Sequence, residues 1–128
     1  MKSKLEIYAL SICFAAVVCL VISLGIGSYS LIQVNSPDLT MKSYKFNQFQ
    51  TNKDYWSKHK PRCGDNYNKV EKPEEDELTK QRLMAFEAVK RGEAREGVQS
   101  LIKSTLFIIF STLALFIHWT IAKRCRKS

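Results

Sequence analysis

The side chains with the most chemical potential are two histidines, four cysteines and a run of four acids. His59 and Cys63 have a metal-like spacing, but no second pair of ligands accompanies them, which disfavours zinc. The acids at 74–77 follow Pro73, and a proline followed by acids is typical of a solvated helix start rather than a catalytic cluster. No Ser/His/Asp arrangement at convincing spacing and no phosphate-binding glycine loop is present. The sequence therefore predicts a protein that is not an enzyme and uses no metal or cofactor.

The cysteines do not form the even set expected of a secreted, disulfide-rich module. Cys13 and Cys19 fall in an apolar run, Cys125 in a basic tail, and Cys63 alone in the polar middle of the chain. We expect Cys63 to be a free thiol, with an intermolecular bridge as the alternative.

The excess of positive charge is local. The formal charge of +8 divides into +1 for residues 1–34, +2 for residues 35–100 and +5 for residues 101–128. No basic and aromatic platform suited to nucleic-acid bases accompanies it. A basic tail directly after an apolar run favours anionic lipid headgroups as its partner and argues against nucleic acid.

Two long uncharged runs determine the fold class. Residues 7–26 contain nothing more polar than Ser, Cys and Tyr, and residues 104–122 contain no Lys, Arg, Asp or Glu. About twenty helical residues rise about 30 Å, the thickness of the hydrocarbon core of a bilayer. We therefore predict an all-α membrane protein with two transmembrane helices, a helical hairpin, joined by a polar and partly helical loop.

The first run has the basic start of a signal peptide, but it is longer than the usual apolar region and lacks a convincing cleavage site. We interpret it as an uncleaved span that ends at Asn35-Ser36-Pro37. Basic residues flank both outer ends of the spans, which favours cytoplasmic termini and an external loop. The predicted organisation is a cytoplasmic N-terminus (1–6), first span (7–34), aromatic-containing polar loop (35–73), charged helix (74–103), second span (104–122) and basic cytoplasmic tail (123–128).

Small residues predict packing faces on both spans. In the first span they recur at intervals of four, and in the second at intervals of three and four; such grooves let helix backbones approach closely in lipid. Serine and His118 on these faces offer interhelical hydrogen bonds. Antiparallel packing of the two spans and homodimerisation through the first span remain alternatives. The predicted residues are Ser11, Ala15, Cys19, Ser23, Gly27, Ser111, Ala114 and His118.

His118 is the one titratable side chain within the spans besides the cysteines and tyrosines. An ionisable group at this depth is a functional candidate by default. However, no carboxylate within either span could partner it, and Trp119 and Lys123 place it near the headgroups. We favour a structural, hydrogen-bonded histidine over a proton relay.

The first half of the loop has many aromatic residues and few aliphatic ones. It cannot build a substantial core alone, so we expect its rings to rest on the membrane interface, on the second half of the loop or on a partner. Thr51 and Asp54 form a capping box for a short helix through Ser57. The aromatic residues predicted to bind a partner are Phe46, Phe49, Tyr55 and Trp56.

The second half predicts one long helix from about Glu75 to Arg124. No proline interrupts it, although Gly92 and Gly97 weaken it. Asp76 with Lys80, and Glu87 with Arg91, are spaced for favourable ion pairs. A solvated helical linker is the alternative. A narrow apolar stripe is predicted at Leu78, Ala85, Phe86 and Val89.

The segments PDLT (37–40), QTNKDYW (50–56), EAREGVQSL (93–101) and IHW (117–119) resemble those of small two-span inner-membrane proteins of bacteria whose function is uncharacterised. The resemblance covers most of the loop and the second span. It implies a bacterial origin and a two-span fold, but no activity.

The function expected from the sequence is that of a non-catalytic accessory, assembly or scaffold component. It would pair helices in the bilayer, as a homo-oligomer or with another membrane protein, and present its loop to a partner. The alternative is a subunit of a small oligomeric channel or transport complex, which would need several copies because two helices enclose no pathway.

Overall fold

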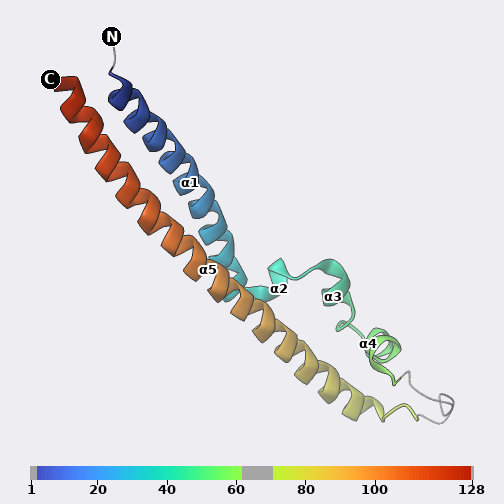
Figure 1. The fold of residues 1–128 in the computed structure, drawn as a ribbon. Coiled ribbons are helices and arrows are strands. Elements are labelled where there is room, and N and C mark those ends of the chain that lie inside the picture. Colours follow the sequence, from blue (N-terminus) through green and yellow to red (C-terminus); the bar gives the residue numbers. More distant parts are fainter. Residues whose placement is uncertain (1–2, 62–70, 128) are drawn as a thin grey trace. The chain divides into compact units, whose positions relative to one another are not determined.

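The computed structural model describes residues 3–61 and 71–127, and within these ranges every regular element is an α-helix (Figure 1). The predicted all-helical fold class is therefore confirmed. Cys63, for which a free thiol was expected, lies outside the described residues. The helices are α1 (Lys4–Asn35), α2 (Pro37–Thr40), α3 (Ser43–Asn47), α4 (Asn52–His59) and α5 (Glu75–Lys127).

The chain forms two compact units. The first comprises α1 up to Ile32 and α5 from Gly97 onward, and the second comprises Gln33 to Glu96. Helix α5 contributes to both units, and it is continuous through Gly92 and Gly97.

Helix α1 ends where the sequence predicts a stop. Pro37 is the first residue of α2, and the residue before a proline is pushed out of the helical region by the proline ring. Ser36 accordingly has φ −140° and ψ 69°, which breaks the helix between Asn35 and Pro37.

Helices α1 and α5 are both long and apolar enough to cross a membrane. Within the most apolar 18-residue window of each, 22% of the residues of α1 and 6% of those of α5 are buried inside the protein. The core helix of a soluble protein would be mostly buried. Here large apolar side chains point outward instead, with exposed fractions of 74% for Phe14, 69% for Phe116 and 67% for Phe110.

In the second unit, an aromatic cluster provides the core. Phe49 is buried, and its ring centroid lies 5.6 Å from that of Phe86, 6.0 Å from that of Tyr55 and 5.5 Å from that of His59. Phe46 meets Phe86 edge-on at 6.0 Å. The loop rings were expected to rest on the membrane interface, on the second half of the loop or on a partner. In the structure Phe46 and Phe49 contact the second half of the loop, because Phe86 belongs to α5.

The predicted capping box is present at the start of α4. The Thr51 hydroxyl oxygen accepts from the Asp54 backbone N–H at 3.1 Å and donates to the Asp54 carboxylate at 2.7 Å. The helix continues two residues beyond the predicted end at Ser57, to His59.

Helix α5 begins at the expected residue, with Glu75, Asp76 and Glu77 in its first turn. Leu78, from the predicted apolar stripe, is fully buried. The ion pairs differ from the expected spacing: Glu87 pairs with Lys90, three residues away, rather than with Arg91. Lys90 also lies 5.0 Å from the centroid of the Phe86 ring, so packing of its stem against that ring favours the closer partner.

Replacing Phe49 with alanine should loosen α3 and α4 from α5. Loss of a buried phenylalanine costs about 3–5 kcal/mol, and Phe49 is the ring that joins three others. Hydrogen exchange of the α4 amides should accelerate. Tyr44→Ala is the control, because Tyr44 is 59% exposed; equal acceleration in both variants would contradict a central role for Phe49.

Candidate functional site

The first unit contains a regular contact seam between α1 and α5. The buried seam residues on α1 follow one another at steps of four, three or seven, and those on α5 at steps of seven or eleven, all of which are threes, fours or sums of them. Steps that average 3.5 residues keep a seam on one face of two helices that coil gently around each other. The seam residues that are buried are Ala9, Cys13, Ala16, Ser23, Gly27 and Ser30 on α1, and Gly97, Ser104, Ser111 and Ala122 on α5.

Three contacts fix the direction of this packing. A Cβ atom at Gly27 would lie 3.1 Å from the Ser104 hydroxyl oxygen. The Cys13 thiol lies 3.9 Å from the Leu115 carbonyl oxygen, and the Tyr8 and His118 rings meet edge-on at 6.1 Å. As the residue number falls on α1 it rises on α5, so the two segments are antiparallel, as Figure 1 also shows.

The contact within the chain follows a different register from the predicted stripe on α1. Ser23 and Gly27 lie in the seam, whereas Ser11, Ala15 and Cys19 are exposed. The reason is geometric: each step of four residues rotates about 40° around a helix, so five such positions spread over nearly half its circumference. The exposed half of the stripe is open to a second copy or another helix, which stays a prediction.

On α5 the predicted residues lie closer to the seam. Ser111 is buried, and Ala114 and His118 are half-buried. Ala122, one helical turn beyond His118, and Ser104, one heptad before Ser111, complete the same face.

The polar groups of the seam bond mainly to their own helices rather than across the interface. The hydroxyls of Ser104 and Ser30 donate to the carbonyls of Leu101 and Ile26. Across the seam, the Cys13 thiol forms a long, weak hydrogen bond to the Leu115 carbonyl oxygen. Of the serines predicted to bond between helices, Ser11 donates to the Ile7 carbonyl of its own helix at 2.9 Å, because a serine in a helix reaches a carbonyl three or four residues earlier without any partner helix.

His118 has a defined structural environment. Its Nδ1 lies 2.8 Å from the Ala114 carbonyl oxygen, so Nδ1 carries the proton in this bond because a carbonyl only accepts. The other side of the ring faces Tyr8. These contacts favour the predicted structural role of His118. Neither of them is a carboxylate that could exchange a proton with the ring in a relay.

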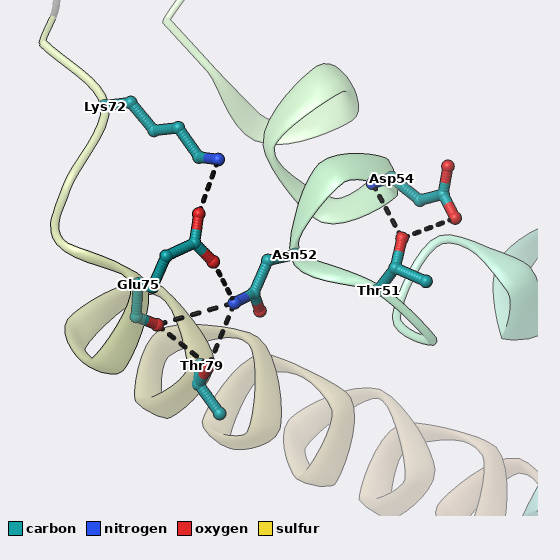
Figure 2. A network of polar contacts seen from close by, with 6 residues as sticks. All are labelled: Thr51, Asn52, Asp54, Lys72, Glu75 and Thr79. Atoms are coloured by element: carbon teal, nitrogen blue, oxygen red, sulfur yellow. Dashed lines mark hydrogen bonds and ion pairs between the residues drawn. The ribbon is translucent and has the colours of Figure 1, made fainter.

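A polar network in the second unit joins α4 to the start of α5 (Figure 2). The Asn52 side-chain NH₂ lies 2.7 Å from the Glu75 carboxylate and 2.9 Å from the Thr79 hydroxyl, with the Glu75 carbonyl oxygen at 3.4 Å. Lys72 donates to the other carboxylate oxygen of Glu75 at 2.7 Å. All acceptors thus face the amide nitrogen, and the network holds α4 at a fixed place on α5.

The side-chain hydrogen bonds from Lys72 and Asn52, together with the charge of Lys72, hold the pKa of Glu75 below its ordinary value of 4.5. Sequence analysis missed Asn52 and Thr79. Their signal was weak, because an Asn after a capping threonine is normally a solvated helix residue.

The predicted partner-binding aromatics divide into two groups. Phe49 is buried in the cluster of the second unit, and its part in binding a partner stays a prediction. Phe46, Tyr55 and Trp56 are half-buried. Tyr55 stacks on His59 with centroids 4.3 Å apart, whereas Trp56 stacks on no other ring among the described residues.

Metal-binding geometry is not found in the described ranges, where no three His, Cys, Asp or Glu side chains gather to hold an ion. His59 instead bonds through Nδ1 to the Tyr55 carbonyl oxygen at 2.9 Å.

No protein-family model, curated protein or solved structure matches this sequence. The arguments for a function therefore rest on the chain's own contacts. Two of its surfaces matter most: the seam between α1 and α5, and the half-exposed aromatic face of the second unit.

Substitution of Gly27 by leucine should disrupt the seam, whereas Gly25→Leu should leave it intact. A side chain at Gly27 meets Ser104, and overpacking of this kind costs about 1–3 kcal/mol. A Cβ at Gly25 meets nothing within 4 Å. The measurement is reversible unfolding in mild detergent, followed by Trp119 fluorescence in a Trp56→Phe background. Equal unfolding midpoints for the two variants would refute the register.

Acidification should loosen the contact between α4 and α5. Because the folded-state pKa of Glu75 is lowered, its stabilisation is complete above pH 4.5 and is lost as the pH falls through the lowered value. Glu75→Gln should remove this pH dependence, and Glu74→Gln should retain it. The side-chain amide resonance of Asn52, followed by NMR during a pH titration, reports the loss directly; a resonance that shifts equally in Glu75→Gln would contradict the assignment.

Proposed function

We propose that the protein is a non-catalytic, two-pass membrane component that assembles through helix packing in the bilayer and presents its second unit to a protein partner. One observation carries the proposal. The outward faces of two helices long enough to span a bilayer consist of large apolar side chains that the chain itself leaves uncovered. In water such a surface is far larger and more apolar than a soluble monomer exposes, whereas in lipid it is the favourable state.

The seam supports a transmembrane hairpin. In hydrocarbon, apolar contact alone does not hold helices together, so small residues that permit close backbone approach take that role. Ala9, Ala16, Ser23 and Gly27 supply such a face on α1, and the local hydroxyl bonds leave few polar groups in need of water.

The exposed small residues Ser11, Ala15 and Cys19 support a second contact, with another copy or another membrane protein. They lie outside the seam, so pairing through them does not compete with the packing of α1 on α5. If several copies gathered in this way, the alternative function as a channel or transport-complex subunit would follow.

The second unit supports the partner-binding part of the proposal. Trp56 is half-buried and Tyr44 is exposed, and on α5 Leu83 and Met84 are 52% and 72% exposed. Large apolar groups on a polar segment are common where another protein docks.

The proposed location is the inner (plasma) membrane of a bacterium, with both termini in the cytoplasm. The antiparallel seam brings the start of α1 and the end of α5 to one end of the first unit, and the basic residues of both termini gather there. That concentration favours the cytoplasmic side.

Crosslinking with mass spectrometry in native membranes tests the proposal. We expect the chain to remain with membranes after alkaline extraction, and crosslinks from the second unit to one defined protein. Ser11→Leu with Ala15→Leu should abolish homotypic crosslinks within α1, while Phe14→Leu, an exposed apolar exchange, should preserve them. A chain that dissolves without detergent would overturn the membrane assignment, and ion flux through reconstituted oligomers would favour the channel.

A further inference from the structure

A cleft lies between the beginning of α1 and the end of α5 in the first unit. Its volume is about 330 Å³, within the range of roughly 300–1,000 Å³ typical of small-molecule sites. Both helices contribute to it, so the seam must form for the cleft to exist. The lining residues are Glu6, Leu10, Trp119, Ala122, Lys123 and Arg126.

The charges of this cleft are mixed. Lys123 and Arg126 are three residues apart, hence on one face of α5, while Glu6 stands on α1. Among the described residues, no ion pair within 4.0 Å joins Glu6 to either base. The ammonium of Lys123 lies 5.7 Å from the centroid of the Trp119 ring instead. The cleft thus holds positive and negative groups that are not neutralised by each other.

An apolar hollow adjoins the cleft. It is lined by Thr112, Leu115, Phe116 and Trp119, has a volume of about 430 Å³, and shares Trp119 with the charged cleft. A ligand with a charged head and a hydrocarbon chain fits a charged cleft next to an apolar hollow. The Trp119 indole lies between the two, as tryptophan does at the membrane–water interface.

We propose that this cleft binds one aminophospholipid. Its phosphate would lie on Lys123 and Arg126, its primary ammonium on Glu6, and one acyl chain along the apolar hollow. The proposal rests on the membrane insertion proposed above and adds a specific lipid to it. A purely anionic headgroup suits the basic tail as a whole, but in this cleft it would meet the carboxylate of Glu6.

The headgroup amine decides the selectivity. A primary ammonium offers N–H donors to the Glu6 carboxylate, whereas a choline headgroup has the same charge but no N–H. Choline would need an aromatic face, and Lys123 already lies over the ring of Trp119. The N–H donors therefore favour ethanolamine over choline, and the carboxylate of Glu6 disfavours the anionic glycerol headgroup.

The test uses the full chain with Trp56→Phe, so that Trp119 is the remaining tryptophan. The protein is reconstituted into phosphatidylcholine vesicles containing a small, equal fraction of a lipid with brominated acyl chains, which quench tryptophan on contact. The headgroup of the brominated lipid is ethanolamine, choline or glycerol. Ethanolamine lipid should quench Trp119 about two- to fivefold more effectively than choline lipid, the range of one exposed ion pair.

Matched variants identify the groups responsible. Glu6→Gln should bring the ethanolamine-to-choline ratio to about one, because the amide keeps the size and loses the charge. Lys123→Gln with Arg126→Gln should weaken quenching by both lipids. Lys127→Gln, which removes an exposed base outside the cleft, should leave the ratio unchanged.

Two results would overturn the proposal. One is a ratio of one in the Trp56→Phe protein while it still floats with the vesicles, which leaves the membrane assignment intact. The other is strongest quenching by the glycerol lipid, further increased by Glu6→Gln, which would assign the cleft to anionic lipids. Failure to float with vesicles would instead defeat the proposed function and this inference together.

Discussion

The first unit depends on how closely the backbones of α1 and α5 can approach. At Gly27 the absence of a side chain leaves room for the hydroxyl of Ser104. The small side chains of Ala9, Cys13 and Ala16 allow α5 to approach the rest of that face of α1 closely. Dispersion contacts weaken steeply with distance, so close approach is itself the source of attraction where apolar burial supplies none. Because Ser30 and Ser104 bond to carbonyls of their own helices, close approach leaves these two hydroxyls with hydrogen-bond partners.

The second unit is held by different interactions. It has few aliphatic residues, so rings supply its apolar contacts, with Phe49 between Phe86, Tyr55 and His59. The hydrogen bonds of Asn52 to Glu75 and Thr79 then fix α4 at one place along α5. Directional bonds define position where a small aromatic cluster alone would allow sliding. One helix therefore serves two purposes: its first half anchors the loop, and its second half packs against α1.

Sequence reasoning located part of the candidate site. Small residues at helical spacing predict a packing face, and this pattern identified Ser23, Gly27 and Ser111. Ser11 and Cys19 belong to the same pattern in the sequence, yet they lie off the seam. A spacing of four matches one helical turn only over short distances, so the pattern identifies small residues correctly but not the line along which a partner meets them. Phe49 and Asn52 were harder, since an isolated ring or amide in a polar segment carries no periodic signal.

Local physical chemistry was enough to predict α1, α4 and α5, whereas the short helices α2 and α3 were not predicted. Two long uncharged runs, the stop at Pro37, the capping pair at Thr51 and Asp54, and the acids that open α5 each act within a few residues, and each gives the same answer in any surroundings. The tertiary structure decided which faces are covered. The 3.5-residue register exists only between two helices, and the choice of Phe49 over Trp56 as the buried ring depends on Phe86, 37 positions away from Phe49. The cleft likewise requires Glu6 and Arg126, which come from opposite ends of the chain. These features follow from contacts between distant segments, whose burial no local pattern encodes.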